Sequence, residues 1–262
     1  MKSKNTPVDS PLADAHCHLQ DPAFAPDLED ALRDARLAGV RVLVINGTRP
    51  EDWPRVRELA SAHLELVPCF GLHPWFAGEA PPGWLDALRG FLDGTPSGVG
   101  EAGLDARRGT AGQGAVFREQ LALARERELP LMVHCVGAWG ELLALLRKDG
   151  APRPGFLLHA YEGSAEAVPT LAGLGAFFSF AARDLQDIRP RTRRALLAVP
   201  PDRLLLETDG PGPRTRGGPA DVRAALTLAA ALRGEDRSAL ARTLWENTER
   251  LLGTLLRSPR SS

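Results

Sequence analysis

The segment Asp14-Ala15-His16-Cys17-His18 ends a short apolar run on two histidines that are two residues apart. Side chains two apart on a strand point to one face, so both imidazoles would project together. Four later apolar runs also close on ligand-type side chains: Gly98-Val99-Gly100-Glu101, Leu131-Met132-Val133-His134, Phe156-Leu157-Leu158-His159 and Leu204-Leu205-Leu206-Glu207-Thr208-Asp209. Functional side chains at the ends of several separate strands are typical of a β/α barrel. The repeated placement therefore predicts one shared site.

Strand-like and helix-like segments alternate along the whole chain, which indicates βα units and a parallel sheet. The apolar runs that we predict as strands are 11–18, 40–46, 64–71, 97–101, 130–135, 155–160, 175–180 and 203–209. The predicted helices are 26–38, 50–62, 83–93, 113–128, 138–149, 164–173, 190–199, 219–232 and a last one at 236–252. The predicted fold is an α/β TIM-type (β/α)8 barrel with an additional C-terminal helix. We expect residues 1–10 to be a flexible tail and 11–256 to be a single domain.

Length and composition agree with one barrel domain and exclude several other classes of protein. The 262 residues are 44% apolar and 25% charged, which is ordinary for a soluble globular enzyme. No apolar stretch approaches the ~20 residues that cross a bilayer, and no apolar segment follows the first two lysines, so neither a membrane partner nor a secretory signal is expected. Three cysteines without CxxC spacing argue against a disulfide framework or a zinc finger. We expect a cytoplasmic protein, as a monomer or weak oligomer.

The distribution of charge says more than the net charge, which is −1. Arg107 and Arg108 follow the predicted strand that ends at Glu101, Arg183 follows the seventh predicted strand, and Arg214 and Arg216 follow the eighth. If these segments are βα loops, the arginines rim the same mouth as the ligands and could attract an anionic substrate. The alternative is chance, because nearly all basic residues here are arginines and some must fall in loops.

The mixture of histidines and carboxylates indicates the chemistry of the site. Neutral imidazoles suit a borderline ion such as Zn²⁺, whereas carboxylates favour harder ions. A glutamate can bridge two ions and hold them at the about 3.5–4 Å used in two-metal hydrolysis. Glu101 is the best candidate for the bridge, because Gly98, Gly100 and Gly103 would leave room for its carboxylate and for a substrate. The alternative is a helix-start or surface carboxylate.

An ordered set of motifs resembles the TatD-type metal-dependent deoxyribonucleases, which belong to the wider amidohydrolase-like barrels. The resemblance spans residues 12–253 and includes the last helix, with Glu246-Asn247-Thr248. The motifs are His16-Cys17-His18, Gly71-Leu72-His73-Pro74, Gly100-Glu101-Ala102-Gly103-Leu104-Asp105, His134, His159 and Glu207-Thr208-Asp209-Gly210-Pro211.

The resemblance implies a binuclear site that cleaves DNA with two divalent ions (Zn²⁺, Mg²⁺ or Mn²⁺). Its metal ligands would be His16, His18, Glu101, His134, His159 and Asp209. By analogy the first two histidines and Asp209 would hold one ion, the other two histidines the second, and Glu101 both. A hydroxide between the ions would attack phosphorus, and Asp209 would accept the proton of the attacking water.

Other residues of the motifs would act beside the ligands. By the resemblance, His73 would contact substrate phosphate or donate a proton near the leaving oxygen; the alternative is a packed loop histidine. Arg107 and Arg214 are further candidate substrate contacts. Glu207 lies two residues before Asp209, on the same face and one layer deeper, where it would support the site or act as a weak ligand.

The sequence departs from the family where the substrate would bind. Val136 stands where the family often has an arginine, and Gly210-Pro211-Gly212-Pro213-Arg214 replaces its aromatic loop. The chain also lacks the interleaved aromatic residues of a generic single-strand stacking platform. Three hypotheses remain open: a DNA phosphodiesterase, an amidohydrolase-type enzyme acting on a small-molecule amide, ester or lactone, and a non-catalytic barrel that binds within a larger assembly.

Overall fold

In the computed structural model of the protein, the described residues are 10–210 and 218–256. They contain one sheet of eight strands, in which each strand pairs in parallel with the next along the chain. The strands are β1 Leu12–Cys17, β2 Val40–Asn46, β3 Leu66–Phe70, β4 Gly98–Asp105, β5 Leu131–Val136, β6 Phe156–Leu158, β7 Ala176–Ala181 and β8 Leu204–Glu207. The predicted tail falls almost wholly outside the described part, so the division at residue 10 stays a prediction.

Backbone hydrogen bonds join the first strand to the chain that leaves the last one. The Asp209 N–H donates to the His16 carbonyl at 2.9 Å, and the His18 N–H donates to the Gly210 carbonyl at 2.8 Å. These bonds bring the two edges of the sheet together beside the predicted ligands. The predicted (β/α)8 barrel is therefore confirmed.

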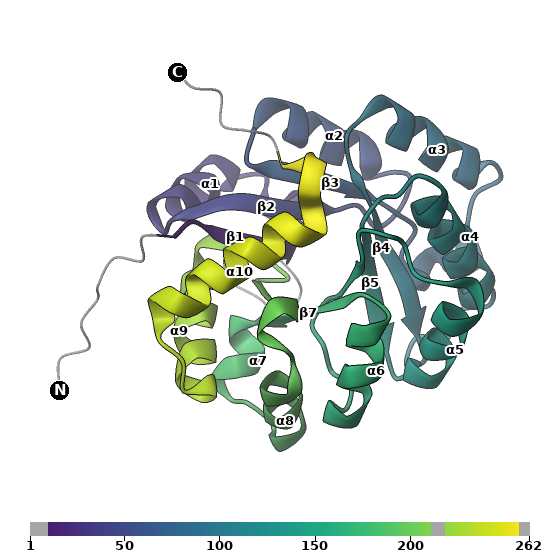
Figure 1. Ribbon diagram of the computed structural model, residues 1–262. Coiled ribbons are helices and arrows are strands. Elements are labelled where there is room, and N and C mark those ends of the chain that lie inside the picture. Colours follow the sequence, from purple (N-terminus) through teal and green to yellow (C-terminus); the bar gives the residue numbers. More distant parts are fainter. Residues whose placement is uncertain (1–9, 211–217, 257–262) are drawn as a thin grey trace.

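Helices surround the strands on the outside, as Figure 1 shows. The α-helices are α1 Leu28–Leu37, α2 Trp53–Ala62, α3 Trp84–Gly94, α4 Gln113–Glu126, α5 Trp139–Asp149, α6 Val168–Gly173, α7 Ala182–Gln186, α8 Pro190–Ala198, α9 Val222–Arg233 and α10 Arg237–Leu252. The 3-10 turns are η1 Pro22–Phe24, η2 Pro74–Glu79, η3 Ala165–Ala167, η4 Pro201–Arg203, η5 Pro219–Asp221 and η6 Gly253–Leu255. The sequence did not predict α7, because five residues are too few to show a helical period.

The C-terminal helix α10 covers the end of the barrel at which the strands begin. Leu251 and Leu255, from α10 and η6, pack in one cluster with the inward-facing Val44, Met132 and Leu205 of the strands. Figure 1 shows α10, in yellow, lying across the strands beside α9.

A buried asparagine fixes this arrangement. The Asn247 side-chain amide donates to the carbonyls of Pro201 and Leu204, at 2.7 and 2.8 Å, where β8 begins. With this end covered, the carboxyl ends of the strands, which we call the mouth, form the face on which barrel enzymes place their active sites.

A polar layer lies directly above the apolar filling of the barrel. Two residues bring a strand back to the same face, so a polar side chain two positions after an inward apolar one lies above it. Three strands show this pattern: His134 follows Met132, His159 follows Leu157, and Glu207 follows Leu205. The sequence-predicted ligands therefore lie toward the mouth of the barrel.

Strand β4 continues past Glu101, contrary to the prediction that the strand closes on this residue. It runs on to Asp105, and its pairing with β5 shifts register between Val99 and Ala102. Glu101 therefore lies within its strand, and its side chain is buried.

The glycines around Glu101 do not leave space for a substrate, which corrects the sequence prediction. Gly103 has φ +156°, and a Cβ there would lie 1.9 Å from the His134 carbonyl oxygen. A Cβ at Gly100 would lie 2.6 Å from Cβ of Met132. The backbone of β5 fills this space, and the glycines allow β4 to approach it closely.

The three cysteines are free and buried. Cys17 and Cys135 pack in the cluster between strands and helices, on the face opposite the ligands, as their spacing predicts. No helix among the described residues is long and apolar enough to span a bilayer.

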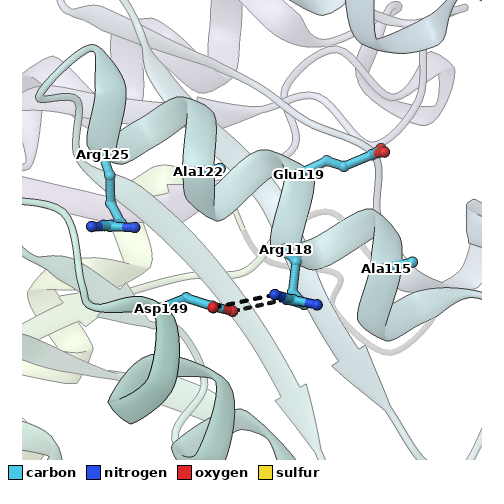
Figure 2. A pocket seen from close by; sticks show the side chains of 6 residues that line it. All are labelled: Ala115, Arg118, Glu119, Ala122, Arg125 and Asp149. Carbon is cyan, nitrogen blue, oxygen red and sulfur yellow. Dashed lines mark hydrogen bonds and ion pairs between the residues drawn. The ribbon is translucent and has the colours of Figure 1, made fainter.

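A shallow groove of about 380 Å³ lies between α4 and α5, on the outside of the barrel. Figure 2 shows its side chains, with Arg118 and Asp149 pointing toward each other in a two-bond ion pair. Arg125 lies further along the same wall, from which none of the predicted ligands projects. This groove is therefore separate from the candidate site.

Candidate metal centre

The carboxylate of Glu101 lies at the centre of the predicted ligands and divides the imidazoles into two sets. Its Oε2 is 3.3 Å from Nε2 of both His16 and His18. Its Oε1 is 2.8 Å from Nε2 of His159 and 3.0 Å from Nδ1 of His134. Each carboxylate oxygen thus faces its own pair of histidines, which is the arrangement a bridging carboxylate requires.

Asp209 completes the first set of side chains. Its Oδ1 lies 3.9 Å from Nε2 of His16 and 3.7 Å from Nε2 of His18. The guanidinium of Arg183 holds the other oxygen, Oδ2, and also contacts the Asp209 carbonyl at 3.4 Å. Asp209 has φ +49°, a left-handed conformation that aspartate tolerates better than most residues. Arg183, one of the arginines predicted to rim the mouth, is paired with Asp209.

In two histidines, the ring nitrogen that faces away from Glu101 forms a hydrogen bond. This bond determines which nitrogen presents a lone pair to Glu101. His18 Nδ1 is 3.0 Å from the Asn46 carbonyl, and His134 Nε2 is 3.3 Å from Asp105 Oδ2. Both oxygens only accept, so these nitrogens carry the hydrogens. In the neutral rings the opposite nitrogens then point lone pairs at the Glu101 carboxylate.

This donor set fits divalent metal ions. In the neutral rings, imidazole lone pairs and carboxylate oxygens converge at 3.0–3.3 Å, an arrangement that a divalent cation between them would stabilise. Three groups of side chains have ligand atoms within 4.8 Å of one another: His16, His18 and Glu101; His16, His159 and Asp209; His73, Glu101 and His134. Neutral imidazoles with bridging and terminal carboxylates are the ligands of Zn²⁺ and related ions.

His73 differs in its hydrogen bonding from the four histidines that are candidate ligands. Its Nδ1 accepts from the backbone N–H of Trp75 at 3.1 Å, so Nε2 carries the hydrogen in the neutral ring. Nε2 lies 3.1 Å from Glu101 Oε1, to which it can donate. Burial lowers the pKa of His73 to about 4, which keeps the ring neutral near pH 7. The arrangement agrees with a proton donor beside the ligand set, and that role stays a prediction.

The buried Glu101 is held in its charged form. Burial acts to raise the pKa of its carboxyl group, but His73, His159 and His16 outweigh burial and hold the pKa well below its usual range. The side chain is only 2% exposed, so water contributes little to this stabilisation. An ionised Glu101 has both oxygens available as ligands.

Glu207 lies one layer below the centre, as predicted, and its bonds are directed to the scaffold. Its oxygens accept from the Ser179 hydroxyl and from the Ala160 N–H, the latter at 2.8 Å. Its Oε1 is 3.7 Å from His159 Nδ1. This supports the turn that carries His159, whereas direct coordination by Glu207 stays a prediction.

The model of the TatD-related DNase family matches residues 13–253 of the chain. The chain belongs to this family. It is 31% identical to the 3'-5' ssDNA/RNA exonuclease TatD of Klebsiella pneumoniae strain 342, over 92% of this chain and 98% of that protein. It is 29% identical to the metal-dependent hydrolase YjjV of Escherichia coli strain K12, over 90% and 95%. The crystal structure of YjjV superposes with a TM-score of 0.83 at 28% identity, covering 92% of this chain and 97% of that one.

Membership of the TatD-related DNase family confirms the family resemblance and the hydrolase class that the sequence predicts. The metal-dependent hydrolase among its relatives agrees with the groups of candidate ligands around Glu101. The number and identity of the ions, and the role of each residue, stay predictions.

No role was predicted from the sequence for Asp105, which the structure places beside His134. Its Oδ2 accepts from the Trp75 indole at 2.6 Å and faces His134, while its Oδ1 accepts from the backbone N–H of Arg107 and of Arg108 at 2.8 and 3.1 Å. Asp105 closes the Gly-Leu-Asp motif, which could have signalled it. The Asn46 carbonyl carries no such signal, because a backbone acceptor is common to every residue.

The arginines predicted to contact the substrate differ in their partners and exposure. Arg107 is at the mouth, 69% exposed on its side chain, and pairs with Glu162 at 3.6 Å. The Arg108 guanidinium lies 3.7 Å over the Trp75 ring. Arg214, like the neighbouring Arg216, lies outside the described residues, and its role as a substrate contact stays a prediction.

Asp105→Asn is expected to weaken divalent-metal binding by about 10- to 100-fold, the usual loss when the partner of a metal-binding histidine is changed. The amide can present its NH₂ group to His134 and no longer fixes the tautomer. Titration of the metal-free protein with Zn²⁺ or Mn²⁺, followed calorimetrically, measures the change. Asp149→Asn, which weakens a surface ion pair on the outer helices, is the control and should bind metal like the wild type. Equal affinities for the two variants would contradict the assigned role of Asp105.

Proposed function

We propose that the protein is a divalent-metal-dependent deoxyribonuclease that hydrolyses phosphodiester bonds of DNA. The observation that carries the proposal is the division of imidazoles between the two oxygens of Glu101. A Klebsiella relative with 31% identity is named as an exonuclease on single-stranded DNA and RNA, which supports a nucleic-acid substrate. The protein is expected to act in the cytoplasm as a monomer or weak oligomer.

Six side chains would hold two divalent ions. In this proposal His16, His18 and Asp209 would hold one ion, the other two ligand histidines the second, and Glu101 both. The distances from Glu101 Oε2 to His16 and His18, and from Oε1 to His134 and His159, support this division. When bound, the ions supply a nucleophile at neutral pH and neutralise charge on the phosphoryl oxygens. The protein contributes the fixed ring tautomers, which keep the lone pairs aimed at the ions without reorganisation.

Two residues would move protons. Arg183 occupies Oδ2 of Asp209, so Oδ1 is the oxygen that faces the site and accepts the proton of the attacking water. The Nε2–H of His73 lies 3.1 Å from Glu101 Oε1, beside the candidate ligands, and would donate toward the leaving oxygen or bind the phosphate. Burial keeps His73 neutral, which suits a hydrogen-bond donor that does not compete with the ions as a charge.

Release of nucleotides from single- and double-stranded DNA tests the proposal, with Mg²⁺, Mn²⁺ or Zn²⁺ added to metal-free protein. Wild-type protein is expected to degrade DNA with at least one of these ions, and Glu101→Ala is the inactive control. Wild-type rates equal to those of the control with all three ions would rule out nuclease activity. Turnover of a lactone or aryl ester under the same conditions would then favour the alternative hydrolase.

A further inference from the structure

Two adjacent aromatic residues, Trp75 and Phe76, follow His73 in the turn η2, and both are half-buried. An arginine guanidinium lies over each ring: Arg108 at 3.7 Å from the Trp75 centroid and Arg49 at 4.9 Å from that of Phe76. Both arginines are exposed and come from the loops that follow β4 and β2. The covered ring faces are therefore open to solvent once the arginine moves.

The Trp75 ring is held against the metal centre. Its indole N–H donates to Asp105 Oδ2 at 2.6 Å, and the same oxygen faces His134. The ring centroid is 4.8 Å from that of His73 and 6.2 Å from that of His134. Both histidines approach Oε1 of Glu101. The indole thus lies within the span of one nucleotide whose phosphate is bound at the centre.

We propose that Trp75 is a stacking surface for a nucleobase of the substrate, an inference that rests on the proposed nuclease function. Every base has a flat π-face, and stacking on an aromatic ring binds bases with little regard to sequence. The Arg108 guanidinium is itself planar and lies where a base would lie. The sequence lacks the interleaved aromatic residues of a generic stacking platform for single strands. A single ring beside the bound phosphate is nevertheless sufficient to stack against one base.

The test compares two oligomers of equal length: an oligothymidylate, and a chain made only of abasic tetrahydrofuran nucleotides. Both oligomers have the same phosphate charge. The kcat/KM for the oligothymidylate divided by the kcat/KM for the abasic chain therefore measures recognition of the bases, whatever the direction of digestion. Wild-type protein is expected to prefer the oligothymidylate by about 5- to 150-fold, the factor for stacking of one base. Trp75→Leu should bring the preference close to one.

Two variants separate stacking from a structural role of Trp75. Trp75→Phe loses the bond to Asp105 but keeps an aromatic face, so it should retain most of the base preference even if both rates fall. Trp245→Leu is the matched control: Trp245 is also half-buried with its indole N–H on a carboxylate, Glu249, but it lies on α10. It should leave the preference unchanged.

The proposal would be overturned if Trp75→Leu lowered kcat/KM by the same factor for both oligomers and so kept the wild-type preference. Turnover of neither oligomer by the wild type would count against the nuclease function instead. In that event, binding of thymidine 5′-monophosphate is compared with binding of deoxyribose 5-phosphate by calorimetry. Tighter binding of the nucleotide that is lost in Trp75→Leu would support stacking, and equal binding of the two would overturn it.

Discussion

Glu101→Gln is expected to lower kcat/KM for DNA by about three orders of magnitude or more, because ions that lose their bridging ligand lose several kcal/mol of transition-state stabilisation. The amide has nearly the same shape but no charge, and it presents an NH₂ group to one of the two sets of histidines. The two oxygens now face His16 and His18 on one side and His134 and His159 on the other. The variant should therefore lose metal as well as activity.

Metal content and turnover should be measured together on this variant. Elemental analysis after dialysis is expected to find less bound metal in Glu101→Gln than in the wild type. Glu119→Gln, an exposed change of the same kind on α4, serves as the control and should match the wild type in both measurements. Wild-type metal content and turnover in Glu101→Gln would show that this carboxylate is not a bridge.

Gly103→Ala is expected to destabilise the folded protein by at least about 3 kcal/mol, because it combines overpacking with a strained backbone. A Cβ at this position would lie 1.9 Å from the carbonyl oxygen of His134 and 2.7 Å from its carbonyl carbon. These are backbone atoms of β5, which cannot turn aside as a side chain would. The glycine also has φ +156°, which residues with a Cβ rarely adopt.

Urea unfolding at equilibrium measures this loss, and α3 provides a matched control. Gly90 lies inside that helix with nothing within 4 Å of a Cβ built on it. Gly90→Ala is expected to raise stability by about 0.5–1 kcal/mol, since alanine has the higher helix propensity. If Gly103→Ala unfolds at the same urea concentration as Gly90→Ala, β4 and β5 can separate at no cost and the packing argument is wrong.

The predicted strands locate all eight observed ones, because each is a short apolar run bounded by polar or turn residues. Their ends were less well predicted. Strand β4 runs four residues past its predicted end at Glu101, and β8 stops at Glu207, two residues before Asp209. Apolar pattern decides where a strand lies, whereas the last hydrogen bond of a ladder depends on the neighbouring strand.

The candidate site, like the strands, could be predicted only in part from the sequence. The candidate ligands could be identified from the sequence, since imidazoles and carboxylates recur at the ends of several predicted strands. Their convergence follows from the parallel barrel, which collects the carboxyl ends of all strands at one mouth. The pairing of Arg183 with Asp209 was not predicted, because residues 26 apart meet only after β7 and β8 align.

By itself, then, the sequence determined the barrel, the order of its strands and the chemical types that gather at its mouth. These follow from local pattern: apolar runs, helical periods and a ligand after each of several strands. Only the tertiary structure decided which nitrogen of each histidine faces Glu101, that β5 fills the space beside the glycines, and that Trp75 lies against the centre. Those features depend on contacts between distant segments, such as Asp105 with Trp75 and Asn46 with His18, and no local pattern encodes them.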